Sequence, residues 1–406
     1  MKRIGITAGT LYGNRGAEAM VSTCIEQVKI RYPDASLHIL SYYPEDDRAE
    51  RDKMHGSADQ SRVYVHSLTP LKLLSSWLPA SFFALLMPKG RNTGLDRDGL
   101  GPLKLIGGLD AVFDVAGVSF IDNRLKFIPF NVLTLFPFLL NNVKVFKLSQ
   151  AMGPITNIFN LIAARLILPK LSLLVARGQQ TFSFVSTSPI KDLRLTNHPD
   201  VSFVLDQSSV TPYQDRAEKA IAVMPSALVA KNDPQYVSKM VDMMRKLHDA
   251  GYKLTLIAHS WRSNTEKSRN NDLVVARAIQ SRLPSGVDVL GEGLSARELR
   301  DVTSRYRCVL TSRFHGLIAA LTTLTPVIVI GWSHKYQEVL DDFSFDRSNC
   351  IDFKNFDVNS VFKKIEHTVD NGPILSQKIE SKLPGIKQKT EEQFLVAFNV
   401  IDEANG

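Results

Sequence analysis

The chain has 406 residues, of which 44% are hydrophobic and 22% charged, and its formal net charge is +8. This balance excludes a disordered or fibrous protein, and the length predicts about two domains rather than a single core. The excess of basic residues favours anionic partners such as phosphates, carboxylates or a lipid surface. The three cysteines, Cys24, Cys308 and Cys350, lie far apart without a CxxC pair, which argues against a disulfide framework or a cysteine zinc site.

The first half of the chain alternates short apolar segments with helical patterns. Residues 2–8 predict a buried strand with no apolar leader before it, so we expect a cytoplasmic protein. A glycine-rich turn over 9–16 then leads into a helix from 17 to about 31, which ends before Pro33. Further buried strands are predicted over 37–42, 111–115, 143–148 and 173–176, and the charged stretch 44–62 is predicted to be a loop.

Two apolar stretches in this half are candidates for membrane contact. Residues 71–87 approach the length of a membrane span but contain Lys72, two serines and Pro79, and residues 127–140 are too short to span. We therefore expect buried helices at both places. The alternative is an apolar surface that rests on the inner face of a membrane beside basic residues such as Lys89 and Arg91.

The second half repeats the alternation more regularly. Asp233 and Pro234 predict the start of a helix whose apolar face runs over 237–247, and Ser295 and Glu298 predict a capping box before another helix. Strands are predicted over 221–224, 254–258, 308–311 and 326–330, with a helix over 313–324.

Repeated strand–helix–strand units build parallel sheets that helices cover on both faces. The polar stretch 208–219 separates two such series. The sequence therefore predicts an α/β protein with two Rossmann-like, doubly wound domains facing a cleft. The N-terminal domain spans 1–210 and contains the two apolar helices, the C-terminal domain spans 211–375, and an amphipathic helix over 376–406 follows.

Open parallel sheets bind ligands beyond the carboxyl ends of their strands, so polar residues there are the site candidates. In the strongest stretch, Ser312 is expected to cap a helix, and Arg313 and His315 to occupy its first turn. A helix N-terminus attracts anions and disfavours cations, so an arginine and a histidine there indicate a bound anion. Lys335 adds a second cation after the next strand, and His334 beside it is either a site residue or a surface histidine.

Weaker candidates follow other strands. The turn 9–16 matches neither a dinucleotide fingerprint nor a Walker loop, and either contacts a ligand or simply starts a helix. Arg177 either reaches the cleft or pairs with an acidic neighbour, Asp122 either binds a hydroxyl or caps a helix, and His259 either lines the cleft or sits in a loop. We expect no metal site, because no ligand cluster is visible, and no nucleic-acid partner, because basic and aromatic residues are not interleaved.

These motifs together resemble those of the polysaccharide pyruvyl transferase family over most of the chain. The most specific likeness is the arginine-x-histidine block at 311–320 with a downstream lysine, and the others are Gly13-Asn14-Arg15-Gly16, Ser149–Pro154 and Val175–Gly178. The chain departs from the family pattern at Ala116, where the family has a glycine, and at Gly178, where it has a glutamate.

The resemblance implies the two-domain architecture of the GT-B glycosyltransferases and a transfer of enolpyruvyl from phosphoenolpyruvate to hydroxyls of a glycan or lipid-linked oligosaccharide. A pyruvate ketal forms in polysaccharide biosynthesis, phosphate leaves, and no cofactor is needed beyond the donor substrate. The resemblance makes Arg313, Lys335, Arg177 and Ser312 the donor-binding candidates. The catalytic candidates are His315 and Arg313, with His315 as the general acid that protonates the methylene carbon. The acceptor or cleft candidates are Asn14, Asp122, His259 and His334.

Two other functions remain open from the sequence. A glycosyltransferase with a nucleotide-sugar donor would share the architecture, and Glu338 is the candidate for holding its ribose. A non-catalytic, membrane-associated glycan-binding protein would also fit, but it has no need for Arg313, His315 and Lys335.

Overall fold

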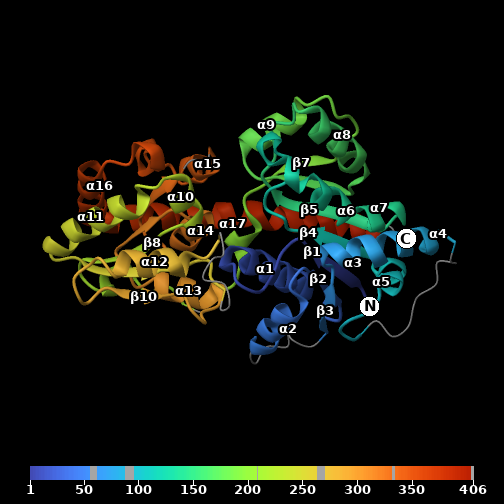
Figure 1. Ribbon diagram of the computed structural model, residues 1–406, viewed down its shortest axis with the longest axis horizontal. Helices are drawn as coiled ribbons and strands as arrows, with labels where there is room; N and C mark the ends of the chain where they lie inside the picture. Colours follow the sequence, from blue (N-terminus) through green and yellow to red (C-terminus); the bar gives the residue numbers. More distant parts are fainter. Residues whose placement is uncertain (55–61, 87–95, 208, 263–269, 332–333, 404–406) are drawn as a thin grey trace. The chain divides into compact units, whose positions relative to one another are not determined.

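The computed structural model describes residues 1–54, 62–86, 96–207, 209–262, 270–331 and 334–403 (Figure 1). The chain divides into two compact units. The N-terminal unit comprises Met1–Tyr12, Met20–Leu205 and Gln388–Gly406, and the C-terminal unit comprises Gly13–Ala19 and Asp206–Lys387. The glycine-rich turn is divided between the units, with residues 13–16 in the C-terminal unit, and the last helix is divided after Lys387.

The N-terminal unit is built on a seven-stranded parallel sheet in the order β3-β2-β1-β4-β5-β6-β7. The chain moves outward in one direction from β1 and in the other from β4, so the topological switch point lies between these two strands. The strands are β1 (Arg3–Thr7), β2 (Ser36–Ser41), β3 (Val63–Ser67), β4 (Ala111–Asp114), β5 (Lys144–Gln150), β6 (Leu173–Ala176) and β7 (Leu195–Asn197).

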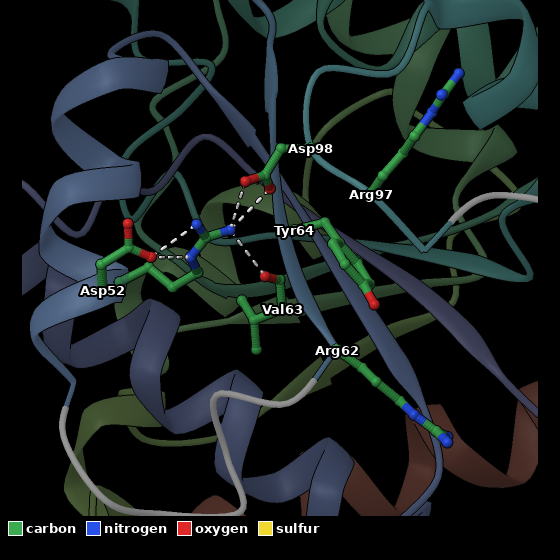
Figure 2. A pocket seen from close by; sticks show the side chains of 7 residues that line it. Asp52, Arg62, Val63, Tyr64, Arg97 and Asp98 are labelled. Atoms are coloured by element: carbon green, nitrogen blue, oxygen red, sulfur yellow. Dashed lines mark hydrogen bonds and ion pairs between the residues drawn. The ribbon is translucent and has the colours of Figure 1, made fainter.

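An arginine–carboxylate network ties the amino end of β3 to the segment that precedes α5 (Pro102–Gly108) (Figure 2). Arg51 Nη1 donates to Asp98 Oδ1 at 2.7 Å and to the Val63 carbonyl at 3.1 Å, and Asp98 Oδ1 also accepts the Val65 N–H at 2.7 Å. The hollow beside this network has a volume of about 430 Å³ and is lined by Arg51, Asp52, Arg62, Val63, Tyr64, Arg97 and Asp98. This hollow lies at the amino end of β3, whereas parallel sheets bind ligands at the carboxyl ends of their strands, so it is not a candidate ligand site.

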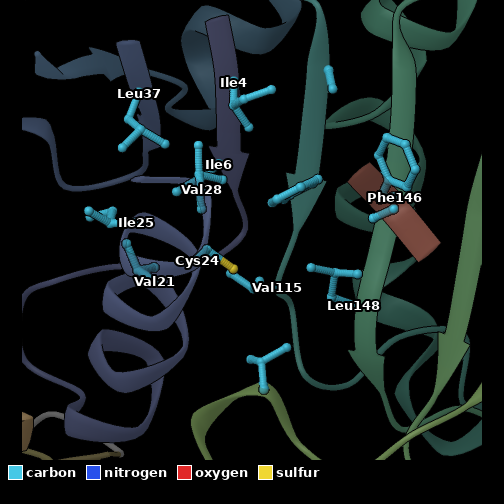
Figure 3. Packing of buried hydrophobic residues seen from close by; sticks show 14 of the residues in the cluster. Ile4, Ile6, Val21, Cys24, Ile25, Val28, Leu37, Val115, Phe146 and Leu148 are labelled. Carbon is cyan, nitrogen blue, oxygen red and sulfur yellow. The ribbon is translucent and has the colours of Figure 1, made fainter. Parts of the chain in front are cut away.

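One face of this sheet is covered by α1 (Arg15–Arg31), beginning at Met20, and by the second part of α17 (Gly372–Glu403) (Figure 3). Phe113 of β4 packs within 6.4 Å of Phe394 and 6.2 Å of Phe398, measured between ring centroids. The sequence predicts only a tail helix over 376–406, whereas α17 begins at Gly372 and its last turns complete the core of the N-terminal unit.

The sequence predicts a loop over 44–62, and that prediction is wrong for Pro44–Lys53, which form α2. Pro44 occupies the first turn, where a missing N–H costs nothing, and three acidic residues beside it favour the positive end of the helix dipole. The third of them, Asp47, is buried and accepts the backbone N–H groups of Leu11 and Tyr12 at 2.9 Å each. The proline, the acidic first turn and the hydrogen bonds to Asp47 therefore favour a helix here rather than a solvated loop.

Helices that precede β4 and follow β4, β5 and β6 pack on the other face of the sheet, as right-handed crossovers require. Their inner sides bury Leu73, Trp77 and Phe138, but Phe82 is 55% and Leu86 83% exposed, so the prediction of buried helices over 71–87 and 127–140 holds for one side only. The elements are α3 (Pro70–Lys72), η1 (Leu73–Trp77), α4 (Leu78–Leu85), α5, η2 (Asp122–Phe127), α6 (Ile128–Leu133), α7 (Phe136–Leu140), α8 (Ile158–Ile167), η3 (Leu168–Lys170) and α9 (Gln179–Ser186). Met87, Lys89 and Arg91 lie outside the described residues.

Among the helices that the structure describes, none combines the length and the apolar character needed to cross a membrane.

The C-terminal unit repeats the plan with a six-stranded parallel sheet in the order β10-β9-β8-β11-β12-β13. Its switch point lies between β8 and β11. The strands are β8 (Ala220–Met224), β9 (Lys253–Ile257), β10 (Asp288–Leu290), β11 (Cys308–Thr311), β12 (Val327–Gly331) and β13 (Cys350–Asp352). Two parallel, doubly wound sheets confirm the predicted α/β class with Rossmann-like domains.

The helices of this unit begin mostly where the sequence predicts. Ser295 and Glu298 form the expected capping box, and Met240, Met244 and Leu247 are buried as the predicted face of α11. Asp233 caps a turn instead of the helix, because its carboxylate accepts the Gln235 N–H and α11 starts at Tyr236. The helices are α10 (Ala227–Asn232), α11 (Tyr236–Asp249), α12 (Asp272–Gln280), α13 (Ala296–Thr303), α14 (Phe314–Thr322), α15 (His334–Asp342) and α16 (Val358–Asp370), with short turns η5 (Tyr213–Asp215), η6 (Arg347–Asn349) and η7 (Phe353–Asn355). The remaining short turn, η4 (Val201–Val204), belongs to the N-terminal unit.

A buried chain of hydrogen bonds crosses β2 and β3 of the N-terminal unit. The Leu100 N–H donates to His66 Nδ1 at 3.1 Å, His66 Nε2 lies 3.0 Å from His38 Nδ1, and His38 Nε2 lies 3.2 Å from Ser36 Oγ. Because the Leu100 N–H must donate, this chain requires both rings to be neutral with the proton on Nε2. Burial, together with the neighbouring His66, lowers the pKa of His38 to about 3. Burial also lowers the pKa of His66, to about 4.

We expect the free energy of unfolding to fall as the pH drops from about 6.5 to about 4. Below about pH 6.5 the unfolded chain protonates both histidines while the folded chain cannot, which removes up to about 1.4 kcal/mol per pH unit for each ring. Urea unfolding at a series of pH values measures this slope.

The double variant His38→Gln, His66→Gln is expected to show a shallower slope of unfolding free energy against pH than the parent protein. The control His248→Gln, at a more exposed histidine, is expected to keep the parent slope. An unchanged slope in the double variant would contradict the assignment. If the double variant does not fold, the single variant His38→Gln serves the same comparison.

Candidate functional site

The strongest sequence candidates lie at the switch point of the C-terminal sheet. β11 ends at Thr311, and the chain turns through Ser312 and Arg313 into α14. Arg313 occupies the N-cap position, where its N–H donates to Thr311 Oγ1 at 3.0 Å, so the prediction that Ser312 caps the helix is wrong. The Ser312 hydroxyl instead lies 2.9 Å from the Tyr236 hydroxyl, because the Ser312 backbone continues the sheet by donating to the Met224 carbonyl.

A buried carboxylate holds the guanidinium of Arg313. Arg313 Nη2 donates to Asp272 Oδ1, and Nη1 and Nη2 each donate to Asn270 Oδ1 at 3.0 Å. Asp272 also accepts the N–H groups of Ala227 and Ser260 at 2.9 Å. Burial raises the pKa of Asp272, and Arg313 and the two backbone N–H groups oppose that rise. The Arg313 side chain stays 15% exposed, so it is both fixed in direction and reachable by a ligand.

His315 packs against residues 13–16 of the glycine-rich turn, which belong to the same unit. A Cβ at Gly16 would overlap the imidazole ring of His315. Asn14 holds this turn in place, because its Oδ1 accepts the Gly16 N–H at 3.1 Å and its backbone pairs with Ser260. The turn therefore starts a helix, and it also provides the backbone surface on which the candidate general acid rests.

Two arginines lie near His315 and His259, and each is paired with a carboxylate. Burial and then the charges of His315, Arg313 and Arg15 lower the pKa of His259 well below its ordinary value, so His259 is neutral at pH 7. Arg15 is itself buried, forms an ion pair with Glu18 and lies 5.9 Å from the ring centre of Trp261. This arrangement makes His259 a poor proton donor.

Lys335 lies one aromatic ring away from His315. Its Nζ is 4.9 Å from the centre of the Phe314 ring, and that ring packs edge-on against the His315 imidazole at 5.3 Å. The half-buried Lys335 therefore stands beside the first turn of α14. His334 begins α15, but its side chain, like Trp332 and Ser333, lies outside the described residues.

The remaining candidates belong to the N-terminal unit, where each is engaged in structure. Arg177 donates to buried Asp200 at 2.5 Å and to the Gly117 carbonyl at 3.0 Å, which is the pairing alternative. Asp122 accepts the Thr156 N–H at 2.7 Å and the Asn160 amide at 2.8 Å. Desolvation would raise the pKa of Asp122, but these hydrogen bonds hold it below its ordinary value. The structure thus brings together Arg313, His315, His259 and the turn at Asn14, with Lys335 beside them.

A pocket of about 280 Å³ lies at the switch point of the N-terminal sheet. Ala8 follows β1 and Ala116, Val118 and Ser119 follow β4, so these residues form its floor at the carboxyl ends of the two central strands. Its wall comes from the next segment and consists of Phe120, Ile121, Arg124, Phe127, Phe130 and Asn131.

Several of these features were not among the sequence candidates. Asp272 and Asn270 anchor Arg313, yet they follow a different strand, and the only local signal is an Asn271 that caps α12. The residues that form the wall of the N-terminal pocket lie in or just before the apolar stretch 127–140, for which the sequence predicts only a buried helix. Among the described residues, no three or more histidine, cysteine, aspartate or glutamate side chains are grouped to hold a metal ion.

The model of the polysaccharide pyruvyl transferase family matches residues 14–334. The chain belongs to this family.

Solved structures show the same two-unit architecture at very low sequence identity. A putative UDP-N-acetylglucosamine 2-epimerase from Listeria monocytogenes is similar with a TM-score of 0.61 and 10% identity, covering 100% of this chain and 98% of that one. A glycosyltransferase from Rickettsia africae is similar with a TM-score of 0.55 and 13% identity, covering 100% and 96%. The Anabaena HepE protein, solved with UDP and glucose, is similar with a TM-score of 0.53 and 12% identity, covering 97% and 99%. These similarities confirm a GT-B-like fold.

We expect the substitution Gly16→Ala to lower the free energy of unfolding by about 1–3 kcal/mol, because the new methyl group overlaps the His315 ring and either the ring or the turn must move. Chemical denaturation measures the loss, and the imidazole resonances of His315 are expected to shift in an NMR spectrum.

Gly385→Ala is the matched control, because no atom lies within 4 Å of a Cβ at that position. A Gly16→Ala protein as stable as this control, with unshifted His315 resonances, would show that the turn does not pack against the ring.

Proposed function

We propose that this protein transfers a pyruvyl group from phosphoenolpyruvate to hydroxyls of a glycan or lipid-linked oligosaccharide, forming a pyruvate ketal in polysaccharide biosynthesis. One observation carries the proposal: the guanidinium of Arg313 is fixed by Asp272 and Asn270 beside His315 at the switch point of the C-terminal sheet. Family membership supports a pyruvyl transferase, and this arrangement supports the donor and the chemistry.

Phosphoenolpyruvate carries a phosphate and a carboxylate, so its site needs several cations and directed N–H groups. Arg313 offers N–H groups for either anion, Lys335 supplies a second positive charge, and the first turn of α14 adds backbone N–H groups and a positive dipole end. Ser312 supports the site through its bond to Tyr236. Arg177 is left out of the donor site in this proposal, because its paired side chain is only 5% exposed, whereas that of Arg313 is 15% exposed.

The reaction begins with a proton transfer from His315 to the methylene carbon of the bound donor. The C=C π electrons form the new C–H bond, and the adjacent carbon becomes cationic while it still carries the phosphate. The first hydroxyl attacks this carbon and loses its proton, which returns to His315. The C–O bond to phosphate then breaks, the second hydroxyl attacks, and its proton leaves with the phosphate as hydrogen phosphate.

The two histidines of the site have different roles in this proposal. His259 is held neutral by burial and by its positive neighbours. It therefore forms a hydrogen bond with a hydroxyl of the acceptor but does not supply the proton that reaches the methylene carbon. Asn14 and Asp122 act through the turns that they hold, because their side-chain oxygens already accept hydrogen bonds. The pocket at the N-terminal switch point, with polar Arg124 and Asn131 among aromatic side chains, is the proposed acceptor site.

The proposal predicts phosphate release and a product heavier by one pyruvyl group when the protein is incubated with phosphoenolpyruvate and the glycan precursors of its host. His315→Ala is expected to reduce turnover roughly 100- to 10,000-fold, the range of a general acid, while thermal unfolding stays close to the parent protein. His248→Ala is the control, because His248 lies on the surface end of α11.

Thermal-shift screening separates the proposed donor from a nucleotide sugar. Stabilisation by phosphoenolpyruvate supports the proposal, whereas stabilisation by a nucleotide sugar alone would favour a glycosyltransferase. Near-normal pyruvylation by His315→Ala would remove His315 from the mechanism.

Arg313→Lys is expected to raise the KM for phosphoenolpyruvate about 10- to 100-fold with a smaller effect on kcat, because a lysine keeps the charge but loses the second N–H contact. Steady-state kinetics at saturating acceptor measure this split. Arg277→Lys, at an arginine paired with Glu292 on the surface of the same unit, is the control. Unchanged donor kinetics in Arg313→Lys would contradict the role assigned to Arg313.

A further inference from the structure

We propose that the N-terminal unit docks on the surface of a bilayer containing anionic phospholipids through the outer side of α3, η1, α4, η2 and α8. This inference goes beyond the proposed function, because it needs neither the donor nor the reaction. We call this surface the outer helical face. Its apolar members are Leu71, Leu74, Phe82, Phe83, Leu85, Leu86, Phe127, Ile158, Phe159, Ile162 and Leu166.

The outer helical face concentrates the exposed apolar side chains of the protein. It holds eleven of the seventeen large apolar side chains that are exposed among the described residues. On α8, Phe159 is 68% exposed and Ile158 and Ile162 are 57% exposed, whereas Ala163, Ala164 and Ile167 on the inner side are buried. Scattered exposed apolar residues are ordinary on a protein surface, but several large ones on one set of neighbouring helices indicate a binding surface.

These helices point their exposed side chains away from the same face of one sheet. The inner sides of η1, α7 and α8 contribute to a single buried cluster that includes Trp77, Phe138 and Ala164. α7 packs against α4 and α6, and α6 in turn packs against α8, so the elements form a continuous layer (Figure 1). A broad, single-sided apolar layer of this kind suits a planar partner such as a bilayer.

The charge pattern of the same segments matches an anionic surface. Residues 123–191 contain no aspartate or glutamate and eight lysines or arginines, and residues 60–95 also contain no acidic residue. Six basic side chains on this layer are exposed: Lys72, Lys104, Arg124, Lys126, Arg165 and Lys170. Lys126 lies with its Nζ 5.2 Å from the centre of the exposed Phe127 ring, which pairs an apolar body with a charged tip, as interfacial residues do. Basic residues near anionic lipid each favour binding by electrostatic attraction.

A second copy of this chain fits the surface less well. A symmetric dimer brings the same patch of each copy together, so the basic residues of one copy would face those of the other without acidic partners. An anionic bilayer satisfies both the charges and the apolar side chains. The face also adjoins the pocket at the N-terminal switch point, because Arg124 and Phe127 line that pocket.

Flotation of the full-length protein with lipid vesicles tests the proposal. We expect binding to vesicles of equal parts phosphatidylglycerol and phosphatidylcholine to exceed binding to pure phosphatidylcholine at least about tenfold, and to weaken in high salt. The variants Phe82→Ser with Phe83→Ser, and Phe159→Ser with Ile162→Ser, are each expected to lose about tenfold in vesicle partitioning. Both leave the buried cluster intact, and circular dichroism checks that they fold.

The matched control is Ile30→Ser with Leu395→Ser, at positions 74% and 57% exposed on α1 and α17 over the opposite face of the same sheet. Retained vesicle binding in the control and lost binding in the two outer-face variants support the proposal. Equal binding by all variants, or no preference for anionic vesicles, would overturn it. A dimer in vesicle-free buffer that the outer-face variants dissociate would also overturn it, in favour of an interface between copies.

Phosphate release with phosphoenolpyruvate and a water-soluble acceptor is measured on the same variants. A protein that docks on vesicles without releasing phosphate would refute the proposed reaction and leave the docking surface standing. A protein that releases phosphate without docking on vesicles would refute the docking surface and leave the proposed reaction standing.

Discussion

A carboxylate that has no access to solvent holds the candidate site together. Asp272 binds the guanidinium of Arg313 and the backbone N–H groups of Ala227 and Ser260, which come from three different segments of the C-terminal unit. Removing a buried charge from water is costly unless it is paired, so the pair fixes the direction in which Arg313 points. The same carboxylate leaves the arginine partly exposed, which is what an anion-binding group requires.

The glycine-rich turn adds the second constraint. Gly16 allows the backbone to approach the His315 ring more closely than any side chain would permit, and Asn14 and Ser260 hold the turn at that place. His315 is thereby set between this turn and the Phe314 ring. The general acid proposed for pyruvyl transfer needs an anion beside it, and the bound donor would supply that anion.

Each unit has its candidate site at the switch point of its sheet. The C-terminal sheet carries Arg313 and His315 between β8 and β11, and the N-terminal sheet carries a pocket between β1 and β4. The reason is geometric, because adjacent loops diverge only where the order of a parallel sheet reverses. The outer helical face is a separate feature, since it arises from helices that cover one sheet face with their inner sides alone.

The sequence by itself determined the fold class, the positions of most strands and the identity of the strongest candidates. Short apolar runs such as 308–311 and 221–224 report burial on both faces, and burial on both faces requires a parallel sheet between helices. The block at Arg313 and His315 stands out because cations at a helix N-terminus oppose the dipole. These are local properties, and a local pattern is sufficient to reveal them.

Only the tertiary structure decided which residues from distant parts of the chain contact Arg313 and His315. Asp272 and Asn270 precede Arg313 by some forty positions, and Gly16 lies nearly three hundred positions before His315, so no sequence spacing connects them. The same holds for Arg177, whose pairing with Asp200 depends on two adjacent strands, and for Ser312, whose hydroxyl meets Tyr236 from another helix. Side-chain partners are set by how the sheet brings its strand ends together, because that packing fixes distances which the order of residues along the chain leaves open.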